Sequence, residues 1–146
     1  MKTMKLLMMT LLVLLSSTVC NAREKVIKVK DLPVAAQTTL KTYFDGKKVT
    51  LAQKDKEGLI TTYDVLLEDG TKLEFDSKGE WIEIDTKPRP VPSGLVPAAI
   101  SDYVKKNYPD SSIMQIERDR RGYEIDLSNG LDLRFNKQFK LVKIDD

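Results

Sequence analysis

The sequence has no histidine and a single cysteine, Cys20, among its 146 residues. The absence of histidine excludes Ser-His-Asp triads, His-ligated zinc or haem, and switches based on imidazole titration. One cysteine cannot form an intrachain disulfide or an ordinary Cys/His metal site. We therefore expect a protein that is not an enzyme, with no catalytic residues, no metal and no cofactor.

Long hydrophobic runs are also missing, apart from one short run near the N terminus. It spans residues 6–15, follows a positively charged start, and leads to small side chains at Cys20 and Ala22. Ten residues are too few to cross a bilayer, and the arrangement is typical of a secretory leader. We predict a signal peptide over residues 1–22, cleaved near Ala22, and a periplasmic or secreted protein. The alternative is a lipoprotein acylated on Cys20, which Val19 disfavours because such signals need a small residue there.

Net charge is small as well. The 24 Lys and Arg exceed the 22 Asp and Glu by two, and Lys2 and Lys5 of the leader supply that excess. The chain after the leader is thus neutral, which gives no electrostatic support for nucleic acid as a partner. It also contains no second apolar run that approaches 18 residues, so we expect no transmembrane segment in the mature chain.

What the chain does contain is internal similarity. Residues 33–58 align without a gap on 97–122, and residues 63–85 align on 123–145. The identical pairs include Pro33 and Pro97, Gly58 and Gly122, Tyr63 and Tyr123, Gly70 and Gly130, Phe75 and Phe135, and Ile84 and Ile144. Such self-similarity predicts a repeated structural unit.

The predicted organisation has four parts. A signal peptide at residues 1–22 precedes a first repeat at 23–85, a proline-rich linker at 86–94 and a second repeat at 95–146. Three prolines at alternate positions predict an extended, stiff linker. The alternative role of this segment, as a proline-rich recognition peptide, stays open.

Each repeat is predicted to fold as one helix and four strands. Apolar residues at every fourth position, such as Ala36 and Leu40, indicate a helix in each repeat. The dipeptides Asp69-Gly70 and Asn129-Gly130 favour tight hairpins, and apolar and polar residues alternate on either side of them. The predicted fold class is α+β, with two tandem α-β-β-β-β repeats. In each, a helix packs on one face of an antiparallel meander sheet, and the opposite face is open.

Two motifs resemble a known family. The helix-ending pair Tyr108-Pro109 and the stretch Tyr-Glu-Ile-Asp-Leu-Ser-Asn-Gly at 123–130, matched by residues 63–70, are similar to PepSY-like proteins that include secreted, tandem-repeat members called β-lactamase-inhibitor-like. The sequence departs from the pattern at Phe139, where the first repeat has Gly79. The resemblance implies helices on one side of a curved sheet. It also implies a role in restraining enzymes or in sensing and binding in the envelope.

We therefore predict a non-enzymatic periplasmic or secreted module. It would bind an unknown protein or peptide through the open sheet face. Inhibition of an envelope hydrolase would be one form of such binding. The alternative is a binder of a small ligand or envelope component, with a pocket between the repeats. A groove-sized apolar pocket would favour the second function, and a broad exposed face would favour the first. The sequence leaves open the oligomeric state and whether the two repeats share one continuous sheet.

Alternation along the strands selects the residues of the predicted binding face. Trp81 is the only tryptophan, and a tryptophan on an open face is a good anchor for a partner; the alternative is that it packs beneath a loop. The predicted partner-binding residues are Trp81, Leu66, Leu141, Glu83, Lys143 and Arg134. Acidic residues are also expected there: Asp64, Glu68, Glu74, Glu124, Asp126 and Asp132. Because basic residues interleave with them, we interpret these acids as a solvated surface rather than as a catalytic pair. Calcium ligation by Asp126, Ser128 and Asn129 is disfavoured, because they lack EF-hand-like spacing.

Overall fold

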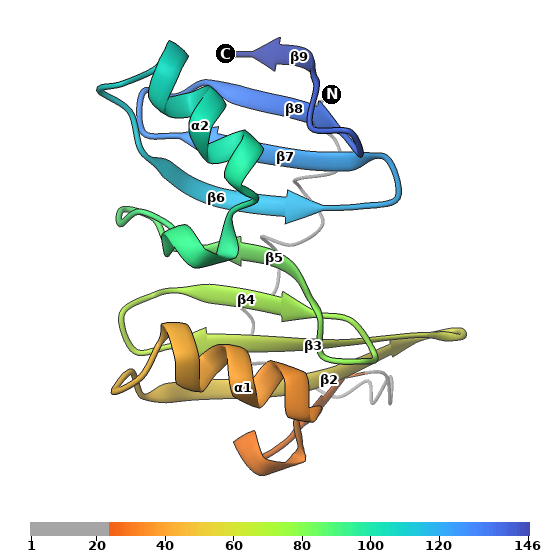
Figure 1. Ribbon diagram of the computed structural model, residues 1–146. Helices are drawn as coiled ribbons and strands as arrows, with labels where there is room; N and C mark the ends of the chain where they lie inside the picture. Colours follow the sequence, from red (N-terminus) through yellow and green to blue (C-terminus); the bar gives the residue numbers. More distant parts are fainter. Residues whose placement is uncertain (1–23) are drawn as a thin grey trace.

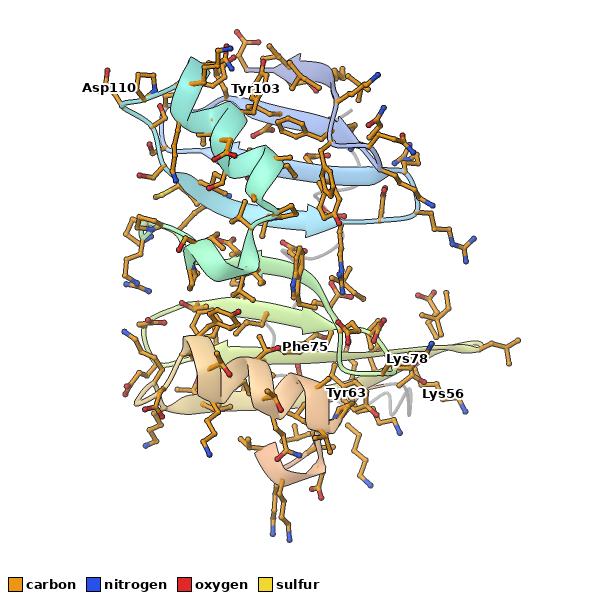
Figure 2. The ribbon with its side chains drawn as sticks, viewed as in Figure 1. Lys56, Tyr63, Phe75, Lys78, Tyr103 and Asp110 are labelled. Atoms are coloured by element: carbon orange, nitrogen blue, oxygen red, sulfur yellow. The ribbon has the colours of Figure 1, made fainter. Side chains whose placement is uncertain are left out.

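Nine antiparallel strands form one sheet in the computed structural model, which describes residues 24–146 (Figure 1). The strands lie side by side in chain order, from β1 at one edge to β9 at the other. Their bounds are β1 Glu24–Val26, β2 Val49–Glu57, β3 Ile60–Leu67, β4 Lys72–Phe75, β5 Trp81–Asp85, β6 Ile113–Arg118, β7 Gly122–Leu127, β8 Asp132–Asn136 and β9 Leu141–Asp145. The predicted signal peptide and the acylation alternative at Cys20 lie outside the described residues.

Two α-helices lie on the same face of this sheet (Figure 1). Helix α1 (Val34–Tyr43) crosses the first half of the sheet and α2 (Ala98–Asn107) crosses the second, each buried through residues four apart, such as Ile100 and Val104. A proline precedes each helix, where its missing N–H costs no hydrogen bond. Short 3-10 turns, η2 (Val29–Asp31) and η3 (Ser93–Leu95), lead into them. We call the covered side the helix face and the other side the open face.

The prediction of two tandem helix-plus-sheet repeats is wrong. Strand β5 pairs with β6, so that all strands of both predicted repeats belong to a single sheet. Ile84 lies opposite Ile116 in this pairing, and neither side chain has any exposed surface. Two separate sheets would uncover both isoleucines and leave the backbone groups of two strand edges unpaired, which is costly. The fold is α+β with one continuous sheet.

The segment between the two halves is packed rather than a free spacer. Val91 is buried, and its N–H donates to the carbonyl of Ile113 over 2.8 Å. The Thr86 hydroxyl donates to the carbonyl of Met114, and Arg89 contacts Asp69 in the β3–β4 turn. These contacts fix the start of β6 beside the end of β5.

Apolar residues directly opposite one another cross the helix face from β3 to β8. The row runs through Val65, Leu73, Ile84, Ile116, Ile125 and Leu133, none more than 2% exposed. Direct cross-strand neighbours pack closely, so this row ties consecutive strands into one hydrophobic core. Both helices close over that core, and the polar residues between the apolar ones face the other side.

Candidate functional site

Five carboxylates stand directly opposite one another across five strands of the open face. Each pair is a register pair, so the row passes without interruption through Asp64, Glu74, Glu83, Glu117 and Glu124 on β3 to β7. We call this set the carboxylate row. Neighbouring side chains in such a row begin about 5 Å apart, a separation at which like charges repel. The row therefore concentrates negative charge along a line in a chain with little net charge.

Burial and mutual repulsion raise the pKa values of three carboxyl groups in the row. Partial burial, with added repulsion from Asp64 and Glu83, raises the pKa of Glu74 to about 7. Burial likewise raises the pKa of Glu83 to about 7, with Glu117 as the strongest charged neighbour, and that of Asp64 to about 6. Two effects that disfavour the charged form thus add up, and the middle of the row holds protons near neutral pH.

Basic groups flank the row. On β8 and β9 the same line continues through Arg134, which hydrogen-bonds Glu124, and Lys143. Lys87 reaches over from the linker and donates to Gln115 and to Asp126, at 2.6 and 2.8 Å. The open face is therefore acidic over β3 to β6 and mixed toward β9.

A second, denser group of acids lies beside the end of the row. Glu124, Asp126 and Asp132 each offer a carboxylate oxygen within 4.8 Å of the others. Carboxylate oxygens are the ligands that hard cations such as Ca²⁺ prefer. All three residues also make contacts within the protein, including the ion pair of Asp126 with Lys87. Their arrangement can accept a positive group from solvent or from the chain itself.

The structure separates the six predicted partner-binding residues into two groups. Glu83, Arg134 and Lys143 lie on the line of the carboxylate row, and Leu66 lies beside it, opposite Lys72. Trp81 and Leu141 instead pack against the hydrophobic core. A register shift in β4–β5 puts Trp81 opposite the buried Phe75, and the same shift in β8–β9 puts Leu141 opposite Phe135. A partner-binding role of these six residues stays a prediction.

Trp81 also has a charged neighbour on the helix face. The guanidinium of Arg118 lies 4.4 Å from the centre of the indole ring, a cation–π distance. Simple alternation misses this placement because a β-bulge adds one residue to β5. The sequence does contain an indication of this bulge. Three of the five residues in Trp81–Asp85 are apolar, and strict alternation cannot place all three on one face.

The sequence did not predict that two further acidic residues, Glu117 and Asp85, lie on the open face. Glu117 was not placed on either face, because alternation in its own strand, Ile113–Arg118, is irregular. A register shift between Ile113 and Gln115 accounts for that irregularity. Asp85 joins the same face opposite Lys72 and Gln115. Such neighbours follow from strand pairing, which local sequence does not specify.

Comparison with known proteins identifies the family. Residues 61–143 match the family described as "Putative beta-lactamase-inhibitor-like, PepSY-like", and the chain belongs to this family, as predicted. No curated protein matches the sequence. Within residues 24–146, no helix has both the length and the apolar character needed to span a membrane.

Three solved structures are similar to this chain. A protein from Bacteroides vulgatus ATCC 8482, described as a putative periplasmic protein of the DUF2874 family, has a TM-score of 0.83 at 45% identity and covers 84% of this chain and 97% of its own. A "putative calcium-regulated periplasmic protein" from Bacteroides thetaiotaomicron has a TM-score of 0.82 at 43% identity, with the same coverage. A further B. vulgatus protein, described as a "putative periplasmic protein of unknown function", has a TM-score of 0.80 at 44% identity and covers 84% of this chain and 99% of its own. The protein is therefore periplasmic, as predicted, and none of these descriptions names a catalytic activity.

Proposed function

We propose that this periplasmic protein is a non-enzymatic binding module that holds a basic segment of another protein on its open sheet face. The carboxylate row is the observation that carries the proposal. Five acidic side chains in line, two of them with a pKa raised to about 7, form a surface on which burial and mutual repulsion oppose negative charge. Lys or Arg side chains of a partner would compensate it.

The dimensions of the row suit an extended peptide. Five neighbouring strands about 4.8 Å apart place the first and last carboxylates roughly 19 Å from each other. An extended chain that advances about 3.3 Å per residue covers this length with about six residues. Alternate side chains of such a segment point the same way, so about three basic side chains would meet the row.

Binding of cations should release protons from the row. A positive charge near Glu74 and Glu83 favours their charged forms and lowers their pKa values toward the usual range. At pH 7 the partly protonated row then loses protons as the peptide binds. Inhibition of an envelope hydrolase is one use of such a surface, if the basic segment borders that enzyme's active site.

Calorimetry with a Lys-Arg hexapeptide tests the proposal. The protein should bind the hexapeptide, and the heat measured in buffers of different ionisation enthalpy should reveal proton release at pH 7. The double variant Glu74→Gln/Glu83→Gln should bind about tenfold more weakly, because two charge-assisted contacts are lost. Glu57→Gln is the matched control, since it removes an exposed carboxylate at the β2–β3 turn. Equal affinity of the double variant and the control would refute a role of the row.

Calcium binding is a second candidate function, favoured by a separate observation. Glu124, Asp126 and Asp132 bring three carboxylate oxygens within 4.8 Å, and the relative from B. thetaiotaomicron is described as calcium-regulated. We expect Ca²⁺ to raise the thermal unfolding temperature and Asp132→Asn to abolish that rise. Glu57→Gln again serves as control. No shift with millimolar Ca²⁺ would exclude this candidate and leave the peptide proposal untouched.

A further inference from the structure

The apolar row of the helix face does not end at Leu133. On the last strand, Ile144 stands directly opposite Leu133 and continues the row. Leu133 has no exposed surface, whereas Ile144 is 48% exposed. Its counterpart on β5, Ile84, also stands opposite a leucine and is fully buried. The difference is the next strand: β6 covers Ile84, and within residues 24–146 β9 pairs with β8 alone.

The backbone of β9 offers an open edge at the same residue. On β5, the N–H of Thr86 donates to the carbonyl of Met114, so the backbone groups of residues 84 and 86 point toward β6. The β4–β5 and β8–β9 pairs share the same register and bulge. The backbone N–H and C=O of Ile144 therefore point away from β8, ready to pair with another strand.

The geometry points to a second copy of this chain as the occupant of this edge. We infer a symmetric dimer in which β9 pairs antiparallel with β9 of the other copy and Ile144 lies opposite Ile144 on the two-fold axis. This arrangement reproduces the existing β5–β6 junction, where Ile84 lies opposite Ile116. It gives one sheet running through both copies, with all helices on one side, and it is independent of the ligand that the open face takes.

Charge complementarity sets this register. When Ile144 pairs with itself, Lys143 of each copy lies opposite Asp145 of the other, which makes two opposite-charge pairs on the open face. Within one copy, the ammonium of Lys143 already lies 2.8 Å from the Asp145 carboxylate, so both groups are positioned at the edge. Moving the two-fold axis by one residue, to Lys143 or to Asp145, would lose both pairs and place two lysines or two aspartates opposite each other on the axis. A self-complementary edge of this kind favours a second copy over a foreign strand.

A cysteine at residue 144 tests the register directly. The protein, produced with its own leader and purified from the periplasm, should dimerise with rising concentration in analytical ultracentrifugation. Hydrogen-bonded pairs in antiparallel strands have Cα atoms about 5.5 Å apart, which suits a disulfide. Ile144→Cys should therefore form a disulfide-linked dimer under mild oxidation. Val142→Cys is the matched control: it is 57% exposed on the same strand, yet the two copies of residue 142 would lie roughly 14 Å apart.

Charge reversal tests the proposed pairs without touching the core. Lys143→Glu and Asp145→Lys should each weaken dimerisation about tenfold, because each creates two like-charge contacts. The combined variant should restore it. A monomer at every concentration, or a dimer that neither variant weakens, overturns the proposal. A monomer whose residue 144 cysteine crosslinks to other periplasmic proteins overturns it as well, because the edge then takes a foreign strand.

Discussion

Glu74 lies directly opposite Glu83 on the open face, and burial and repulsion raise the pKa of each carboxyl to about 7. Two acids in register are usually destabilising when both are charged. The pair is tolerated because the folded protein binds protons there that the unfolded chain would release.

This relationship predicts a stability that falls as pH rises. An unfolded glutamate loses its proton near pH 4.5, whereas the folded pair keeps protons until about pH 7. Between these values the folded state binds more protons, so the free energy of unfolding decreases with increasing pH. We expect a loss of about 2–3 kcal/mol from each group, up to about 5 kcal/mol for the pair, between pH 5 and pH 8. Urea unfolding at both pH values measures it, and Glu74→Gln/Glu83→Gln should flatten the profile. A stability that rises over this range would contradict the assignment.

The place of Trp81 against the core predicts a structural cost for its removal. Trp81→Ala should lower the free energy of unfolding by about 2–4 kcal/mol, since partly buried aromatic packing and the contact with Arg118 are lost. Leu59→Ala, at a fully exposed position in the β2–β3 turn, should change it by less than about 0.5 kcal/mol. If both variants unfold at the wild-type urea concentration, Trp81 is free to serve as a surface anchor.

Gly79 combines two constraints that one control can separate. It has a φ of +85°, and a Cβ atom there would lie 2.7 Å from Cβ of Pro33 and 2.8 Å from the backbone nitrogen of Ala36, at the start of α1. Gly70 has a φ of +86° but no atom within 4 Å of such a Cβ. We expect Gly70→Ala to cost about 1 kcal/mol from backbone strain alone, and Gly79→Ala to cost about 2–3 kcal/mol more. Equal unfolding free energies for the two variants would show that the start of α1 shifts to accommodate the added Cβ atom at no cost in stability.

Asp69 connects the β3–β4 turn to the linker and to the start of β2. Although burial opposes it, hydrogen bonds from the backbone of Thr71 and from Lys47, with Arg89 nearby, lower the pKa of Asp69 to about 2. Asp69→Ala should therefore destabilise the protein by about 1–2 kcal/mol. Asp110→Ala, in the exposed loop after α2, is the control and should leave the melting temperature unchanged. A similar melting temperature for both variants would mean that the Arg89 contact contributes nothing.

Local sequence predicted those parts of the fold that depend on neighbouring residues. The helical stripes at Leu40 and Val104 and the buried alternation around Leu73 are found as predicted, because propensity, turn chemistry and period all act over a few residues. The joining of β5 to β6 was not predicted. Their paired residues are separated by 30 or so positions, and no local signal states which strand a free edge will meet.

The candidate site could be predicted only in part for the same reason. Alternation along each strand placed Asp64, Glu74 and Glu124 on one face, but their alignment into a row depends on four consecutive registers. The bulge that turned Trp81 inward changes the face of a side chain through one extra residue. Both are properties of pairing between strands and not of any single strand.

The unbroken meander also has a kinetic consequence. Every strand pairs with the strand next to it along the chain, so most of the sheet can grow by adding short hairpins in succession. Two junctions are exceptions: β1 pairs with β2 across α1, and β5 pairs with β6 only after the chain closes a loop containing the linker and α2. We expect this loop closure to limit the rate at which the exported polypeptide reaches its native state. The contacts of Thr86 and Val91 with the start of β6 should make the closure faster.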